Sequence, residues 1–292
     1  MTQKLAVAFL HGAGTPDEDF ADDMIGKIKQ GFTEKLGLEN ADQEIVFEAV
    51  FWSAVFEEEE KKLLKRLQKN NDLDYLHMRR FVVEFLADAV AYQPTRQGNQ
   101  NYGRANSLLA ESLGNLKEKA GKYAPLCIIS HSLGSVVASN YFYDLQFKQG
   151  NIGPKTREVA SHTPIERGET LALFYTMGSP LAIWSMRYPD FGRPIHVPAP
   201  GLASIYPNVK GEWINFYDKD DVLAFPLKGL NAYYQAAVDK DVEVNVGGWA
   251  TSWTPLSHSK YNTDADVITP IVDGLVKTWR EVNENSLNFA KK

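Results

Sequence analysis

Residues 124–140 read APLCIISHSLGSVVASN, and the fold prediction depends on the transition inside this stretch. The apolar run at 125–129 predicts a strand that is buried on both faces. A tight turn follows, and small and apolar residues then continue as a helix. A serine at such a turn, Ser132, holds its hydroxyl above the sheet, which is the geometry of a nucleophile elbow. The alternative is a structural role, because a serine before a helix often only caps it.

The rest of the chain repeats the alternation of strand and helix. Longer amphipathic segments lie between most of the short apolar runs, which occur at 4–10, 45–52, 125–130, 170–177, 212–217 and 241–246. Runs joined in this way predict crossover helices over a mostly parallel sheet. We therefore expect an α/β fold in which a central sheet of about six strands has helices on both faces, and we expect residues 1–292 to form a single domain.

Two segments interrupt this pattern. Residues 54–96 are expected to form a helical insertion, because acids precede bases from Glu57 to Leu67 as the helix dipole favours, and a second apolar helical stretch follows. The insertion either packs over the sheet or forms a cap over the active site. The second segment, 178–211, contains too many prolines to be a regular helix throughout, and a long loop in a compact domain is usually functional.

Composition excludes several classes of protein. The chain has 31 basic and 37 acidic residues, a net charge of −6 and no long run of lysine or arginine, so nucleic acid is not an expected partner. A single cysteine, Cys127, cannot form an intramolecular disulfide. A strand is predicted almost at the N-terminus, which leaves no room for a signal peptide, and no apolar run is long enough for a transmembrane segment. We expect a cytoplasmic protein.

Residues 130–134, SHSLG, resemble the G-x-S-x-G elbow of lipase-like serine hydrolases in the α/β-hydrolase superfamily. Ser130 replaces the first glycine, whereas Gly134 keeps the second. The resemblance implies an α/β-hydrolase fold with Ser132 as the nucleophile. His131 is then expected to be structural and to point away from the nucleophilic hydroxyl.

In this superfamily the catalytic residues follow in the order Ser, Asp or Glu, His. The resemblance therefore implies that His258 is the general base, since it lies between the last predicted strand and the final helix. The strand at 213–217 ends in three carboxylates that compete for the role of the acid. The family pattern favours Asp221, with Asp218 as a turn-forming alternative and Asp220 as a solvated residue.

The resemblance also implies an oxyanion hole. One donor is expected to be the backbone N–H of Leu133, and the second that of Ala13 or Gly12 in the turn after the first strand. These glycines lack the third glycine of a dinucleotide fingerprint and the Gly-Lys-Ser/Thr of a P-loop. Side chains that follow the strands or precede His258 are expected to line a substrate pocket, unless they fill the core: His11, Ser179, Trp184 and Trp249.

The resemblance thus implies an esterase or lipase-like serine hydrolase that cleaves carboxylic esters through an acyl-enzyme. No metal-ligand spacing is present, so neither a metal nor another cofactor is expected, and the partner is a small-molecule ester or acyl substrate. A thioesterase, amidase or acyltransferase would use the same triad, and a non-catalytic hydrolase-like binding module is a further alternative. The oligomeric state is not predicted.

Overall fold

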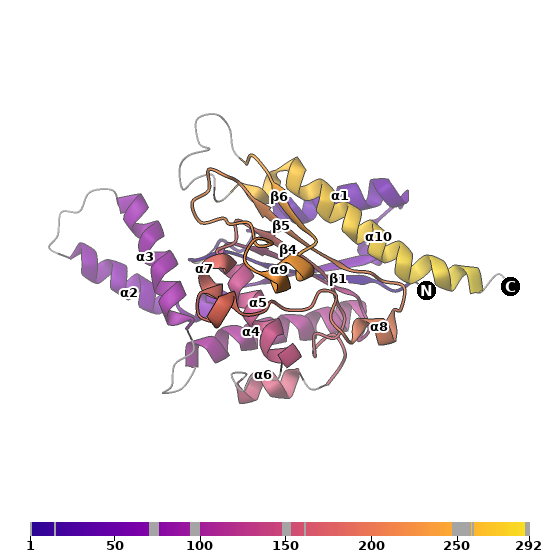
Figure 1. Ribbon diagram of the computed structural model, residues 1–292, viewed down its shortest axis with the longest axis horizontal. Coiled ribbons are helices and arrows are strands. Elements are labelled where there is room, and N and C mark those ends of the chain that lie inside the picture. Colours follow the sequence, from indigo (N-terminus) through magenta and orange to yellow (C-terminus); the bar gives the residue numbers. More distant parts are fainter. Residues whose placement is uncertain are drawn as a thin grey trace.

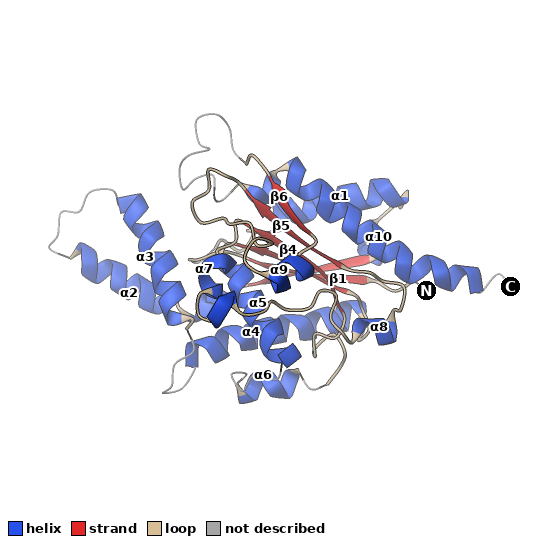
Figure 2. Cartoon of the chain, viewed as in Figure 1, coloured by secondary structure: helices blue, strands red, loops and turns tan. Residues whose placement is uncertain are grey.

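The molecule is built around one parallel β-sheet with helices on both faces (Figures 1 and 2). A computed structural model describes residues 2–14, 16–69, 76–93, 100–147, 153–160, 162–246, 258 and 260–289. Six strands lie in the order β2-β1-β3-β4-β5-β6, and every neighbouring pair is parallel. The predicted α/β class with a parallel central sheet is confirmed.

The strands lie where the apolar runs predict them: Leu5–Leu10 (β1), Ile45–Val50 (β2), Leu126–His131 (β3), Leu171–Met177 (β4), Glu212–Tyr217 (β5) and Lys240–Glu243 (β6). Two of the predicted runs continue past the ends of their strands. After β2, Trp52 begins a 3-10 turn, and its indole N–H donates to the His11 carbonyl at 2.8 Å. After β6, the Val246 N–H donates to the Asp218 carboxylate instead of a strand neighbour.

Two long helices cover one face of the sheet, namely α1 (Asp22–Leu36) and α10 (Ala265–Phe289), and two cover the other, α4 (Gln100–Ala120) and α5 (Leu133–Phe147). None of the helices in the described ranges is long and apolar enough to cross a membrane. Shorter elements are α6 (Pro154–Val159), α7 (Leu181–Ser185), α8 (Leu202–Ile205), α9 (Ala232–Ala237) and 3-10 turns at Ala41–Gln43, Trp52–Val55, Pro189–Phe191 and Tyr261–Thr263. The proline-rich stretch 178–211 contains α7, α8 and one of these turns, and is otherwise irregular.

Alternation along β1 shows how the sheet is buried on both faces. Leu5, Val7 and Phe9 pack in a core with residues of α1 and α10. Ala6, Ala8 and Leu10 pack in a second core with residues of α4 and α5. Every residue of β1 is buried, which explains why its sequence is apolar without a period of two.

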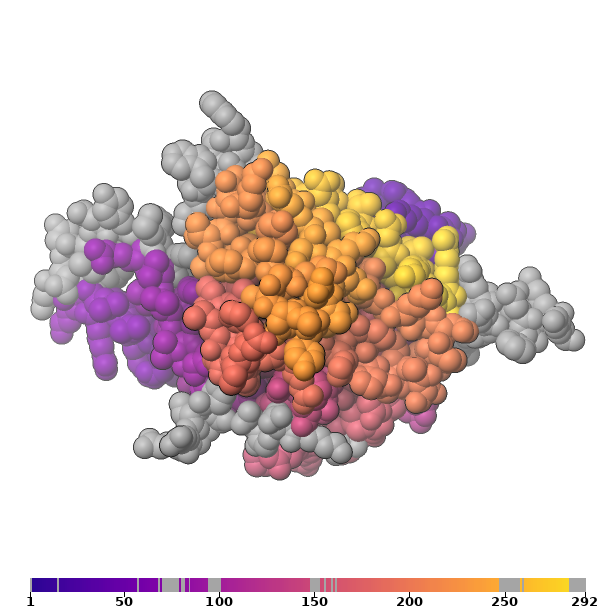
Figure 3. Space-filling view, in the orientation of Figure 1, coloured from indigo at the N-terminus to yellow at the C-terminus, as the bar shows by residue number. Residues whose placement is uncertain are grey.

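The segment expected as a helical insertion contains α2 (Glu57–Gln68) and α3 (Leu76–Ala91), which extend away from the sheet (Figures 1 and 3). The segment is tied into the body near the start of α2, where Glu60 is buried, and at the end of α3, where Asp88 is fully buried. Later in α2, Leu67 is 42% exposed. This segment therefore has an anchored base and an exposed outer part.

The strand order places a topological switch point at the C-terminal ends of β1 and β3. Between these neighbouring strands the order of the sheet reverses, and the helices that follow them, α1 and α5, lie on opposite faces. In open α/β sheets ligands bind outside the carboxyl ends of the strands at such a switch point. The turns at 11–14 and 131–133 both lie at this edge.

Candidate active site

The turn between β3 and α5 holds Ser132 in a strained conformation. Its φ is +50°, which is uncommon for a residue other than glycine. A Cβ on Gly134 would lie 2.2 Å from the His11 carbonyl oxygen, so the start of α5 needs glycine there to approach β1. Ser130 is tolerated in place of the usual glycine because its buried hydroxyl donates to the Tyr175 carbonyl at 3.2 Å.

Hydrogen bonds beneath the turn keep this strained backbone in place. The Ser132 N–H donates to the Met177 carbonyl at 2.9 Å, and the Ser135 hydroxyl donates to the Ser132 carbonyl at 2.5 Å. The hydroxyls of Ser135 and Ser179 lie 2.6 Å apart. Ser179 was expected in a substrate pocket, but it is fully buried and supports the turn from below. Its hydroxyl is used by the fold, because it also accepts the Leu181 N–H at 3.3 Å.

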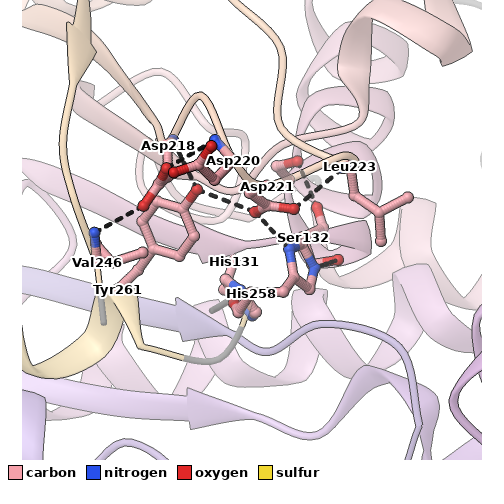
Figure 4. A network of polar contacts seen from close by, with 10 residues as sticks. His131, Ser132, Asp218, Asp220, Asp221, Leu223, Val246, His258 and Tyr261 are labelled. Atoms are coloured by element: carbon pink, nitrogen blue, oxygen red, sulfur yellow. Dashed lines mark hydrogen bonds and ion pairs between the residues drawn. The ribbon is translucent and has the colours of Figure 1, made fainter. Parts of the chain in front are cut away.

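Ser132, His258 and Asp221 meet in a continuous chain of short polar contacts (Figure 4). The Ser132 Oγ lies 2.6 Å from His258 Nε2. The His258 Nδ1 lies 2.7 Å from Asp221 Oδ2. All three side chains are buried although they come from three separate parts of the chain. When Nδ1 of His258 carries the proton and donates a hydrogen bond to the Asp221 carboxylate, Nε2 has no proton. Nε2 can then accept the hydroxyl proton of Ser132.

Both oxygens of Asp221 are hydrogen-bonded. Oδ1 accepts the Leu223 N–H at 3.0 Å, and Oδ2 accepts the Tyr261 hydroxyl at 3.0 Å as well as His258. Burial raises the pKa of this carboxyl, but the bonds from His258, Leu223 and Tyr261 outweigh it, and the pKa lies below its usual value. Asp221 is therefore ionised at neutral pH and can stabilise an imidazolium.

The other two carboxylates that follow β5, Asp218 and Asp220, have surroundings different from those of Asp221. Asp218 is buried and accepts the backbone N–H groups of Asp220 and Val246, each at 2.8 Å, so it shapes the turn (Figure 4). Its own N–H donates to the Tyr261 hydroxyl at 2.9 Å. The side chain of Asp220 is exposed. Tyr261 thus links the turn to the Asp221 carboxylate, a role that no sequence pattern indicated.

His131 contacts the backbone of His258. Its Nε2 lies 2.5 Å from the His258 carbonyl oxygen, and burial lowers the pKa of His131 to about 3, so the ring is neutral and donates through Nε2. The side chain thereby holds the backbone of His258 itself. A Cβ on Gly178 would lie 3.2 Å from His258 Nδ1, so the end of β4 also confines this ring.

The turn after β1 lies directly against the nucleophile. A Cβ on Gly12 would be 3.0 Å from the Ser132 Cβ and 3.5 Å from its Oγ. Within the described ranges no hydrogen bond engages the backbone N–H of Ala13 or of Leu133, the first residue of α5. Two backbone donors near the serine are thus available for an oxyanion.

Three side chains from elsewhere in the chain form hydrogen bonds with the turn at 11–14. The Trp52 indole donates to the His11 carbonyl, and the Ser53 hydroxyl donates to the Gly14 carbonyl at 2.8 Å. The Gly14 N–H in turn donates to Asp88 Oδ2, also at 2.8 Å. Asp88 belongs to α3, so the base of the helical insertion is bonded to the turn. Sequence reasoning missed all three residues, because no local pattern connects them to positions 11–14.

The remaining residues expected in the pocket lie in different places. His11 is buried and stacks on the Trp52 ring, with ring centroids 5.3 Å apart, and burial lowers its pKa to about 3. Trp184 is 9% exposed and lines a hollow beside α5. Trp249 lies outside the described residues. Among the described residues no cluster of three or more His, Cys, Asp or Glu side chains is placed to hold a metal ion.

No family model matches this sequence, and no curated protein matches it. A buried serine, a histidine that can take its proton and an ionised carboxylate behind that histidine can together perform nucleophilic acyl transfer.

Proposed function

We propose that the protein is a serine hydrolase of the α/β-hydrolase superfamily that cleaves carboxylic esters of small molecules. One observation carries the proposal, namely the continuous contact from the Ser132 Oγ through His258 to Asp221, at 2.6 and 2.7 Å. A serine hydroxyl is a poor nucleophile at neutral pH unless a base accepts its proton. The strained backbone at Ser132 supports the same role, since strain of this kind occurs at functional sites.

In the first half of the reaction the Ser132 Oγ attacks the ester carbonyl while His258 Nε2 takes the hydroxyl proton. Asp221 keeps the imidazole in the productive tautomer and stabilises its positive charge. The oxyanion is bound by the N–H groups of Ala13 and Leu133, and such a donor typically contributes about 3 kcal/mol. His258 then returns the proton to the departing alcohol, and the acyl group stays on Ser132.

In the second half a water molecule attacks the acyl-enzyme. His258 Nε2 accepts a proton from this water, and the same two backbone donors hold the second oxyanion. Collapse of this intermediate releases the carboxylic acid and returns the proton to Ser132. Because protein residues perform every step, the proposed reaction needs no cofactor.

A fluorophosphonate probe tests the nucleophile directly. We expect a single adduct by intact mass on the wild type, none on Ser132→Ala and strongly slowed labelling of His258→Ala. Ser204→Ala changes an exposed serine on α8 and serves as the matched control, which should label like the wild type. No adduct on folded wild type, or an adduct that survives Ser132→Ala, would refute the proposal.

A substrate panel then tests the class of bond. Esters, thioesters and anilides of graded acyl length are compared by kcat/KM on the wild type, with Ser132→Ala as the blank. The proposal expects esters to give the highest values. A thioester or an anilide preferred over the matching ester would reassign the substrate while leaving the triad in place.

A further inference from the structure

A donor-rich hollow lies between α5, α7 and the loop that follows α7. Residues of α7 and α9 line it, and both helices are labelled in Figure 1. Four of the side chains that line it carry N–H groups: Asn140, Trp184, Arg187 and Arg193. Asn140 lies on α5 seven residues after Leu133, which corresponds to about 10 Å along the helix axis. The hollow is therefore near the triad but separate from it.

Arg187 is held in place entirely by neutral groups. Its Nε donates to the Trp184 carbonyl at 3.2 Å, its Nη1 to Gln93 Oε1 at 3.2 Å and its Nη2 to Asn140 Oδ1 at 2.9 Å. A guanidinium has five N–H donors, so these three bonds do not exhaust it. Its position is thus set while its charge is not neutralised by any of these partners.

Arg193 brings a second positive charge to the same hollow. Its guanidinium carbon lies 3.8 Å from the centroid of the Phe147 ring, a cation–π contact. Within the described ranges neither Arg187 nor Arg193 forms an ion pair with a carboxylate. The buried Asp144 of α5 is engaged elsewhere, since it accepts the Tyr102 hydroxyl at 2.8 Å.

A further donor in the lining has no acceptor. The indole N–H of Trp184 is buried without a hydrogen-bond partner. A buried donor that lacks a partner costs about 1 to 3 kcal/mol, so a partner is expected at this place.

We propose that the hollow is a binding site for a small oxyanion, a carboxylate or a phosphate, held by Arg187, Arg193 and the indole N–H of Trp184. Such a group has only acceptors and carries negative charge, which complements a lining with excess donors and two cations. The Tyr143 and Tyr188 rings stack with centroids 6.1 Å apart beside it, so an apolar body attached to the anion finds a surface to contact. This site is independent of the serine chemistry.

The indole N–H of Trp184 reports occupancy directly. The chain has six tryptophans, and Trp184→Phe identifies the Trp184 signal in the indole region of a ¹H–¹⁵N spectrum of the full-length protein. Inorganic phosphate, acetate and benzoate are titrated separately at constant ionic strength, with chloride as the blank. We expect a saturable downfield shift of the Trp184 signal, whereas Trp279, already bonded to Glu44 at 3.0 Å, stays in place. Tighter binding of benzoate than of phosphate would identify an organic carboxylate as the ligand, and the reverse a phosphate.

One variant tests a proposed contact, and two others serve as controls. Arg187→Gln should weaken binding by about tenfold or more because it removes a charge-assisted donor pair, whereas Arg104→Gln, an exposed arginine on α4, should not. Ser132→Ala should bind as the wild type does, which separates this proposal from the proposed hydrolase activity. The proposal is wrong if no tested anion shifts the Trp184 signal selectively, as when water alone fills the hollow, or if Arg187→Gln binds unchanged.

Discussion

The turn at 11–14 and the turn at 218–221 both follow a strand of the same sheet, but they are held in different ways. The first, which supplies the proposed oxyanion donor, is held by Trp52, Ser53 and Asp88, which lie far away in the chain. The second, which supplies the proposed acid, has bonds within its own segment in addition to those from Val246 and Tyr261. Asp218 accepts the N–H of Asp220, and Asp221 accepts that of Leu223.

Of the two turns, only the one that supplies the proposed oxyanion donor is bonded to the helical insertion through Asp88. The acid turn keeps its local geometry through bonds two residues apart, with Tyr261 as the added brace. The oxyanion turn instead relies on the end of α3, where Asp88 is fully buried. A change at the base of the insertion should therefore reach the oxyanion donors and leave Asp221 unaffected.

The largest expected effect concerns the acid turn. Asp221→Asn should lower kcat by about 10⁴-fold, because the amide cannot stabilise the imidazolium and favours the wrong tautomer of His258. Steady-state kinetics with an ester substrate provides the measurement, and the exposed Asp220→Asn is the matched control. An Asp221→Asn enzyme with near-normal kcat would mean that another group orients His258.

A smaller effect is expected at the oxyanion turn. Asp88→Ala should lower kcat by about 10- to 100-fold with little change in KM, because a slightly misplaced donor is lost mainly from the transition state. Asp88→Asn keeps an acceptor for the Gly14 N–H and should restore most of the rate, while the exposed Asp17→Ala should behave as the wild type.

A merely structural role for Asp88 predicts a different result. The thermal midpoint would then fall for Asp88→Ala, and kcat per folded molecule would stay unchanged. The same result would show that the turn at 11–14 keeps its geometry without the insertion, and the contrast between the two turns would disappear.

The third expected effect is on stability as a function of pH and not on the reaction itself. Burial lowers the pKa of His11 to about 3 from its ordinary value of 6.5, so the unfolded chain binds this proton more readily than the folded one. Above pH 6.5 His11 is neutral in both states and does not reduce the free energy of unfolding. As the pH falls from 6.5 towards 3, only the unfolded chain binds the proton, so the free energy of unfolding decreases. His11→Asn should therefore show a shallower loss of denaturation midpoint than the wild type over this range, measured by chemical denaturation at each pH. Equal slopes would mean that His11 does not contribute to the pH dependence.

Much of the fold could be predicted because burial on both faces leaves a local signal. All six strands follow from short apolar runs between turn residues. The ends of the runs were less informative, since Trp52 and Val246 are as apolar as strand residues. Trp52 leaves the sheet to bond the turn at 11–14, and Val246 bonds the Asp218 carboxylate, and both choices depend on partners distant in the chain.

The sequence by itself determined where a serine elbow can form, because an apolar strand, a small-residue turn and Gly134 are neighbours in the chain. It also placed a histidine and three carboxylates in an order compatible with a triad. Only the tertiary structure decided that Asp221, and not Asp218, contacts His258, because that choice depends on the side chains packed around the turn. For the same reason the supports of the oxyanion turn and the donor-rich hollow could not be predicted, since their residues meet only after the sheet and its helices have packed.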